Sequence, residues 1–292
     1  MATTTSPLRY PGGKGSLLDL VSRILKYNDL ERGHYVEPYA GGCGLALSLL
    51  YGGYVSDIHI NDIDRSIWSF WDSVLNRTDK LVKLIENTPI TIDEWKRQRD
   101  IQRDERVTDT LKLGFATFFL NRTNRSGIIK GAGVIGGLSQ EGNYKLDCRF
   151  NRTELVRRIR RVKKYENQIH LTNMDAIEFM KDSDNLPENS FICIDPPYFN
   201  KGSSLYTSFY GTDDHKGVSE LVLGLKHPWI VTYDDAEEVR KLYKSRRQFS
   251  FDINYSVQTK RLGTEIMIAS KGLRLPEEIR ERKVHRPQHR AA

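Results

Sequence analysis

The chain has 292 residues, of which 38% are hydrophobic and 28% charged, and its formal net charge at pH 7 is +7. This length predicts one domain with a sizeable insertion, or two domains, and the composition is ordinary for a soluble globular protein. It excludes a membrane helix, since no apolar run approaches roughly 20 residues, and the N-terminus lacks the features of a signal peptide. Cys43, Cys148 and Cys193 show neither C-x-x-C spacing nor a disulfide framework, so we expect a cytoplasmic location.

The positive charge is unevenly distributed. Residues 76–164 hold 21 lysines and arginines against 11 acids, a net +10, so the remainder of the chain sums to −3. A polyanion-binding insertion would have this composition, and so would a set of solvated charged helices. The tail, 271–292, has seven basic and three acidic residues, and we expect a frayed end with auxiliary phosphate contacts at most.

The first motif is YPGGKGS, at residues 10–16. Its glycines and lysine suggest a phosphate-binding loop, which requires the pattern G-x-x-x-x-G-K-[ST]. Here Gly15 follows Lys14, and Leu8 stands where the first glycine is needed, so the motif is not a phosphate-binding loop.

The next segments predict a β-α-β unit. Residues 34–50 read as a strand, a glycine-rich turn and a helix, and residues 55–64 alternate apolar and polar side chains before ending in acids. From Arg65 to about Tyr165 helical spacing dominates. Within it we expect a polar connecting stretch at 91–107 and a hairpin or irregular ribbon in the glycine-rich segment 127–150.

A basic helix at 151–167, opened by an Asn or Thr cap, leads back to strand signals. These predict three strands, at 168–176, 190–198 and 227–235. A helix at 236–243 and an antiparallel edge pair, at 248–257 and 264–270, follow. The fold class is therefore α/β, with a Rossmann-like sheet interrupted by a mostly helical insertion that carries a β-hairpin. The expected domain ranges are 1–66 with 166–270, the insertion 67–165, and the tail 271–292.

Two motifs follow predicted strands. EPYAGGCG (37–44) lies between a strand and a helix, where α/β sheets bind nucleotide-like ligands, although its glycines alone would also fit tight packing. Asp62 ends the next strand about 20 residues later, where a carboxylate can bond ribose hydroxyls. In the second motif, Asp195-Pro196-Pro197-Tyr198, the apolar run 191–194 leads directly into two prolines, which end the strand rigidly.

Together these motifs resemble the Dam-type (D12 class) DNA adenine-N6 methyltransferases, in that family's usual order and over roughly residues 7–270. YPGGK resembles the family's N-terminal motif, YVEPYAGG its cofactor loop, NDID its ribose acid and DPPY its catalytic tetrad. FFLNRTNRSGI resembles the start of its DNA-contacting ribbon. The resemblance implies a Rossmann-like fold and S-adenosylmethionine as the methyl donor.

By this resemblance, the cofactor contacts are Tyr10, Lys14, Glu37, Gly41, Asp62, Asp175 and Asp195. Lys14 would pair with the methionine carboxylate, which has the charge but not the geometry of a phosphate; a solvated loop lysine is the alternative. Asp175 maps to the adenine contact, and a helix N-cap is the alternative there.

The resemblance places the chemistry at Asp195, Pro196, Pro197 and Tyr198. The N6 lone pair of adenine is delocalised into the ring, and it is freed for methyl transfer when the Asp195 carboxylate and the Pro196 carbonyl each accept one N6–H. No covalent intermediate or metal is required. Tyr198 would stack on the extruded base, or else be a core aromatic residue.

DNA contacts are expected from Arg122, Arg125 and Lys130, although each could equally be a surface charge. GATC-modifying members carry an arginine near the position of Lys130, and lysine lacks its bidentate fork, which argues against GATC as the target. Residues 203–215 are expected to form a lid over the site.

We therefore interpret the chain as an adenine-N6 methyltransferase acting on double-stranded DNA, from a phage, prophage or bacterial modification system. A cognate restriction endonuclease is a conceivable partner, and we expect a monomer or weak dimer without membrane association. Two alternatives stay open: an RNA or protein amide methyltransferase, and a DNA-binding regulator on a catalytically weak methyltransferase scaffold.

Overall fold

The structure is a computed structural model, and it describes residues 5–10, 14–199, 210–255, 261–277, 279 and 284–285, with backbone only for 251–255, 261–264 and 284–285. Several sequence expectations lie outside the described residues. They are Gly12 and Gly13 of the first motif, residues 203–209 of the expected lid, and most of the basic tail.

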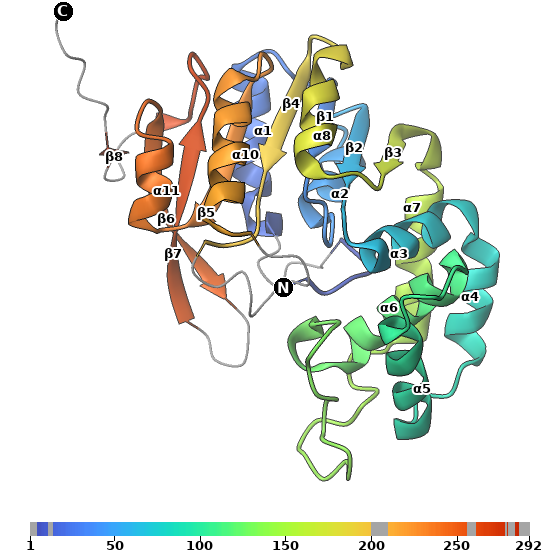
Figure 1. Cartoon of the computed structure of the whole chain (residues 1–292). Helices are drawn as coiled ribbons and strands as arrows, with labels where there is room; N and C mark the ends of the chain where they lie inside the picture. Colours follow the sequence, from blue (N-terminus) through green and yellow to red (C-terminus); the bar gives the residue numbers. More distant parts are fainter. Residues whose placement is uncertain are drawn as a thin grey trace, which may run out of the picture.

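A mixed β-sheet in the order β3-β2-β1-β4-β5-β7-β6-β8 forms the centre of the molecule (Figure 1). Its strands are β1 (His34–Glu37), β2 (Asp57–Asn61), β3 (Ile169–Thr172), β4 (Ser190–Ile194), β5 (Trp229–Asp234), β6 (Arg247–Tyr255), β7 (Arg261–Ala269) and β8 (Val284–His285). The first five run parallel to one another, whereas β7 and β6 add antiparallel pairs. The α/β class predicted from the sequence is confirmed.

The strand order changes direction between β1 and β4. From β1 the chain proceeds outward to β2 and β3, and from β4 it proceeds the other way to β5. The pairs His34–Ser190 and Val36–Ile192 set the register of the two adjacent strands. A crevice at the carboxyl ends of such strands is the usual ligand site of open α/β sheets. Because β1 and β4 are adjacent and parallel, their carboxyl ends, at Glu37 and Ile194, lie next to each other.

Helices cover both faces of the sheet because neighbouring strand residues point to opposite sides. The helices next to the sheet are α1 (Leu18–Tyr27), α2 (Gly44–Tyr51), α8 (Ala176–Lys181), α10 (Thr212–Gly224) and α11 (Glu237–Leu242). Tyr35 of β1 packs in the cluster that includes α1 and α2, while its neighbour Val36 packs in the cluster that includes α8, α10 and α11. The result is a three-layer arrangement.

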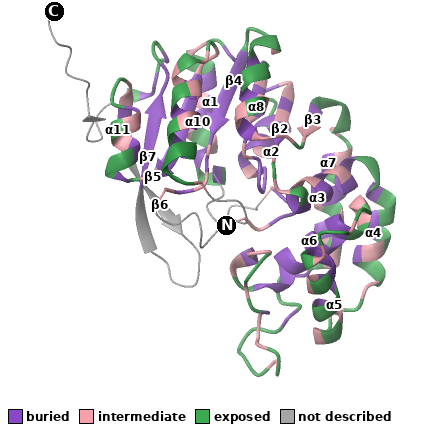
Figure 2. Cartoon of the chain, in the orientation of Figure 1, coloured by how far each residue is buried: buried purple, intermediate pink, exposed green. Residues whose placement is uncertain are grey.

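A second group of helices lies between β2 and β3 in the chain and beside one end of the sheet in Figure 1. These helices are α3 (Arg65–Asn76), α4 (Thr78–Asn87), α5 (Ile92–Arg103), α6 (Thr110–Thr123) and α7 (Arg152–Lys163). Asn151 caps α7 by accepting a hydrogen bond from the Glu154 amide at 3.1 Å, as the sequence predicted. Figure 2 shows that α6 is mostly buried, whereas α4 and α5 expose a large part of their surface.

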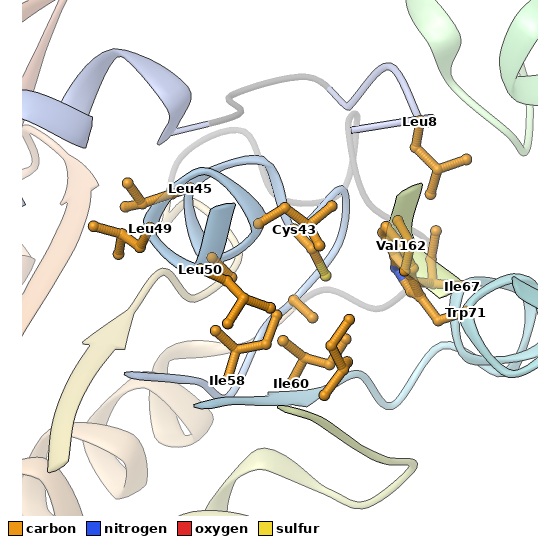
Figure 3. Close-up of a cluster of buried hydrophobic side chains, with 14 of the residues drawn as sticks. Leu8, Cys43, Leu45, Leu49, Leu50, Ile58, Ile60, Ile67, Trp71 and Val162 are labelled. Atoms are coloured by element: carbon orange, nitrogen blue, oxygen red, sulfur yellow. The ribbon is translucent and has the colours of Figure 1, made fainter. Parts of the chain in front are cut away.

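The hydrophobic core continues from the sheet into these helices. Figure 3 shows Leu45, Leu49 and Leu50 of α2 near Ile58 and Ile60 of β2, with further apolar side chains from α3 and α7 beyond them. Leu8, from the segment before the first motif, is buried in the same cluster. The N-terminal segment is therefore held between the sheet and the helical group.

The helical region differs from the sequence predictions at two points. Of the two alternatives expected for residues 127–150, the structure has the irregular ribbon: turns, bends and the isolated bridge Asn124–Val134 stand in place of a β-hairpin, because left-handed glycines such as Gly131 and Gly136 repeatedly turn the chain. The polar stretch expected to connect helices contains α5. Its apolar face is narrow, with Trp95 and Ile101 buried, so the many charged residues concealed the helical spacing. Among the described residues, no helix is long and apolar enough to cross a membrane.

Candidate active site

A pocket lies at the carboxyl ends of β1, β2 and β4. It brings together these predicted site residues: Tyr10, Lys14, Glu37, Gly41, Asp62, Asp195 and Pro197. Tyr39, Cys43, Cys193 and Tyr210 also line it. The predicted residues come from four separate stretches of sequence. Strand order brings Glu37, Asp62 and Asp195 to one edge of the sheet, and the N-terminal segment adds Tyr10 and Lys14.

Asp62, just after β2, is fixed by two backbone amides. Its Oδ2 accepts a hydrogen bond from the Gly41 amide at 2.9 Å, and its Oδ1 accepts one from the Asp64 amide at 2.9 Å. Burial raises the pKa of Asp62 to about 7, and the Asp64 charge adds to the effect. Since each carboxyl oxygen has two lone pairs, each can accept one further hydrogen bond from a ligand hydroxyl.

Glu37 ends β1 on the same side of the pocket. Its carboxyl group accepts a hydrogen bond from the Tyr35 hydroxyl at 2.9 Å. Burial raises the pKa of Glu37 to about 8 against the opposing effect of this hydrogen bond. The raised pKa favours the protonated form of Glu37, which has a hydrogen-bond donor as well as acceptors.

The glycine-rich turn of the cofactor motif is held from the helical group. The Trp71 indole of α3 donates a hydrogen bond to the Gly41 carbonyl at 2.9 Å. Cys43, the residue that precedes α2, adopts a left-handed conformation with φ 50°. A residue other than glycine is strained there, and its burial shows that packing holds the turn in this shape.

Asp195 follows β4 and lines the pocket. Its Oδ1 accepts a hydrogen bond from the Thr232 hydroxyl of β5 at 2.8 Å and lies 3.2 Å from Lys14 Nζ. Oδ2 makes no hydrogen bond with the residues that the structure describes. The side chain is 25% exposed. Burial raises the pKa of Asp195 to about 6, although Lys14 opposes the shift.

Lys14 is a buried part of the site, not a solvated loop lysine. Its side chain is 6% exposed, and its ammonium group lies 2.8 Å from Glu265 Oε2 and 3.2 Å from Asp195 Oδ1. Burial alone would lower the pKa of Lys14, but the two carboxylates raise it above its usual value. Its main partners are thus carboxylates of the protein. One of its three N–H donors remains for a ligand.

Tyr198 has a different environment from the one expected. Its side chain is only 3% exposed, and its hydroxyl donates a hydrogen bond to Glu265 Oε1 at 2.6 Å. Lys14 Nζ lies 5.6 Å from the centre of its ring. This burial favours the core-aromatic alternative for Tyr198. Pro196 of the same motif is buried, while Pro197 lines the pocket.

Asp175 acts as a helix cap. Its Oδ1 accepts hydrogen bonds from the Ile177 amide at 2.8 Å and the Glu178 amide at 3.4 Å, at the start of α8. The pocket lining in the described part of the chain does not include it. The structure thus favours the N-cap alternative for this residue.

The predicted DNA contact at Arg122 is not supported. Its side chain is 6% exposed, and its guanidinium group donates a hydrogen bond to the Pro7 carbonyl. Burial lowers the pKa of Arg122 to about 9, and the neighbouring charges of Arg158 and Arg9 add to the effect. In this structure Arg122 is therefore buried and bound to the N-terminal segment, and it is not an exposed surface charge.

The other residues of the expected DNA-contact motif are partly buried and partly exposed. Asn121 exchanges hydrogen bonds with the Arg9 backbone, at 2.8 and 2.6 Å. Asn124 accepts one from the Trp95 indole at 2.7 Å, and both asparagines are buried. Arg125 and Lys130 are exposed on the loop that follows α6, so of the three predicted DNA-binding residues these two are accessible.

Sequence reasoning missed Glu265 and Thr232, which hold Lys14 and Asp195. The signal for Glu265 was a single acid directly before the apolar run IMIA of a predicted strand. Tyr210, which belongs to the segment expected to cover the site, lines the pocket, and its hydroxyl lies 3.1 Å from that of Tyr39.

The sheet thus places acids at three adjacent strand ends around one pocket, at the edge where open α/β sheets usually bind their ligands. The sequence model of the D12 class N6 adenine-specific DNA methyltransferases matches residues 10–261, and the chain belongs to this family. The family assignment made from the motifs is confirmed, and with it the activity of an adenine-specific DNA methyltransferase.

Individual relatives are distant. The chain is 23% identical over 224 residues to the Type II methyltransferase M.MjaIII of Methanocaldococcus jannaschii, an alignment that covers 71% of this chain and 75% of that protein. A crystal structure of a protein proposed to be an RNA methyltransferase, from Pyrococcus horikoshii, aligns with a TM-score of 0.42 and 9% identity. The alignment covers 90% of this chain and 84% of that one.

Proposed function

We propose that this chain transfers a methyl group from S-adenosylmethionine to N6 of an adenine extruded from duplex DNA, with Asp195 as the residue that acts on the amino group. The observation that carries the proposal is the asymmetry of the Asp195 carboxylate. Lys14 and Thr232 hold Oδ1, while Oδ2 makes no hydrogen bond with the described residues. A held carboxylate with one available oxygen is preorganised to accept a hydrogen bond.

The residues of the pocket fit an S-adenosyl cofactor. The fixed carboxyl group of Asp62 can accept hydrogen bonds from ribose hydroxyls, and Gly41 and Tyr10 line the space beside it. The third donor of Lys14 suits a carboxylate, so the predicted contact with the methionine part stays in the proposal as a secondary role. When bound, the cofactor supplies an electrophilic methyl group on a sulfonium.

Asp195 and Pro196 would act on the adenine. The amino nitrogen of adenine is a weak nucleophile because its lone pair is conjugated with the ring. Acceptance of its two N–H groups by Asp195 Oδ2 and the Pro196 carbonyl favours a tetrahedral nitrogen with an accessible lone pair. Positive charge develops on this nitrogen as it is methylated, so the carboxylate stabilises the transition state more than the ground state.

The helical group between β2 and β3 is the proposed DNA-recognition region, over residues 67–165. Two observations support this role: the net charge of +10 for residues 76–164, and the exposure of Arg125 and Lys130 on the loop after α6. The hydrogen bonds between Asn121 and the Arg9 backbone tie this region to the N-terminal segment, which continues into Tyr10 at the pocket. DNA bound to the loop would then lie beside the pocket.

The test uses purified protein, unmethylated duplex DNA and labelled cofactor. We expect label in N6-methyladenine, and sequencing of the modified DNA gives the recognition site. Asp195→Asn should reduce transfer by more than about a hundredfold with cofactor and DNA affinity retained, because it removes the charge but not the shape. Asp182→Asn, an exposed acid on the surface, is the matched control.

Transfer to RNA or to a protein amide instead of DNA would refute the substrate assignment. Retained DNA and cofactor binding without any methyl transfer by the wild-type protein would favour the regulator alternative. Unchanged turnover by Asp195→Asn would remove the proposed role of Asp195.

A further inference from the structure

Glu265 is a buried acid that touches two separate parts of the site. It lies on β7, paired with Asp234 of β5, and its side chain has no exposed surface. Its Oε2 accepts a hydrogen bond from Lys14 Nζ at 2.8 Å, and its Oε1 accepts one from the Tyr198 hydroxyl at 2.6 Å. Through these bonds a single carboxyl group connects the first motif to the tetrad at the end of β4.

The stability of the sheet does not explain this acid. The three residues that follow it, Ile266, Met267 and Ile268, are buried and apolar. Burying an ion pair costs desolvation free energy that the attraction between the charges barely offsets. A protein with well-packed apolar side chains in place of the pair is often equally stable. The contacts that Glu265 makes, and not its burial, therefore indicate its role.

The charges around Lys14 indicate what those contacts do. One ammonium lies between two carboxylates, and it is nearer to Glu265, at 2.8 Å, than to Asp195, at 3.2 Å. Without Glu265 the ammonium would have Asp195 as its only anionic partner in the described cluster. A closer Lys14–Asp195 pair would neutralise the carboxylate that must accept the substrate N–H.

We propose that Glu265 is a positioning residue for methyl transfer. By holding the Lys14 ammonium and the Tyr198 hydroxyl, it prevents Lys14 from closing on Asp195 and keeps Asp195 Oδ2 available to the amino group of adenine. This inference rests on the proposed function. Glu265 touches neither cofactor nor substrate in it, and acts through Lys14 and Tyr198.

The first measurement is the single-turnover rate of methyl transfer by Glu265→Gln, which keeps the shape and removes the charge. We expect the rate to fall by more than about tenfold while the dissociation constants for cofactor and DNA change by less than about twofold. Tyr198→Phe, which removes only the hydroxyl, should give a smaller loss in the rate. The exposed Glu238→Gln on α11 is the matched control and should equal the wild type.

A double-mutant cycle separates positioning from simple damage. If Glu265 acts through Lys14, adding Glu265→Gln to Lys14→Gln should cost far less than it costs in the wild type. Independent, additive losses would overturn the proposal. If Glu265→Gln does not fold, the same comparison with Tyr198→Phe in place of Glu265→Gln decides the outcome.

The second measurement does not require activity. The titration midpoint of the Asp195 carboxyl group, from carbon NMR with Asp195→Asn to assign the signal, should move to lower pH in Glu265→Gln. The like charge of Glu265 is lost and Lys14 turns fully to Asp195. An unmoved midpoint would overturn the positioning role. Absence of methyl transfer by the wild type would instead refute the proposed function, and the midpoint would still test the coupling.

Discussion

Tyr10 packs directly against Gly41: a β-carbon placed on Gly41 would lie 2.7 Å from Cε1 of the Tyr10 ring. A β-carbon placed on Gly42 would likewise lie 2.7 Å from Cβ of Tyr10. Gly41 and Gly42 of the cofactor motif are thus required by the first motif, since only residues without a side chain allow the two segments to lie together. This contact and the Trp71 hydrogen bond fix the turn beside the pocket.

Gly41→Ala should weaken cofactor binding. The residue has φ +47°, which disfavours a β-carbon, and the added methyl group would displace the Tyr10 ring. We expect the cofactor dissociation constant to rise by about tenfold or more, with a fall in unfolding free energy of about 1–3 kcal/mol. Titration calorimetry and thermal unfolding measure the two effects.

Gly224→Ala is the control for this change, because no atom lies within 4 Å of its added β-carbon and its φ is ordinary. A Gly41→Ala protein with wild-type cofactor affinity would show that the turn is not part of the binding site.

Arg122→Ala should affect stability, whereas Arg125→Ala should affect DNA binding. Arg122 is buried and donates to the Pro7 carbonyl, so its loss should lower the melting temperature through a cavity and an unsatisfied carbonyl. Arg125 is exposed, so its loss should leave the melting temperature unchanged and weaken DNA binding.

The measurement for Arg125 is DNA affinity at several salt concentrations, and removal of one phosphate contact should reduce the salt slope by about one. An unchanged slope with relaxed sequence preference would indicate a base contact instead, and no effect on affinity at all would exclude Arg125 from the interface.

Methyl transfer should weaken in acid through Asp195. The proposed acceptor is the carboxylate, and burial raises the pKa of Asp195 to about 6, so the single-turnover rate should fall as the pH falls through about 6. Thr232→Val removes the hydrogen bond to Oδ1 that favours the charged form, so it should move this acid limb to higher pH. An acid limb that stays in place in Thr232→Val would assign it to another group.

Stability should also decrease in acid, through a row of histidines across three strands. His59 of β2 stacks between His34 and His170, at ring distances of 5.1 and 4.5 Å. Burial lowers the pKa of His59 to about 4, and the charges of His170 and His34 add to the effect, while Asp57 opposes it. The unfolded chain binds this proton near pH 6.5, so stability is complete above that pH and is lost progressively toward pH 4.

Chemical denaturation at several pH values measures this loss, and His59→Gln should make the free energy of unfolding less dependent on pH between about 6.5 and 4. The pKa of Asp57 is lowered, with burial opposing and its hydrogen bond from His170 favouring the charged form, so its contribution is lost only below the usual carboxyl range. A His59→Gln protein with the wild-type pH profile would contradict the assignment.

Much of the fold was accessible from the sequence because its signals are local. The strand before Asp195, the glycine-rich turn after Glu37 and the acid at Asp62 each follow from periodicity or from a neighbouring glycine or proline. The helix α5 was missed because its buried face is narrow within a run of charges. The prediction of a hairpin at 127–150 was wrong because a composition of glycine and β-branched residues does not distinguish paired strands from successive turns.

The sequence by itself determined the family, the α/β class and the strand ends at which the pocket residues stand, because each of these depends on patterns within a few residues or on motif order. The tertiary structure alone decided the partners. Glu265 meets Lys14 across 251 positions of sequence, through the pairing of β7 with β5, and Arg122 turns inward to the Pro7 carbonyl. Side-chain partners depend on how distant segments pack, and no local pattern carries that information.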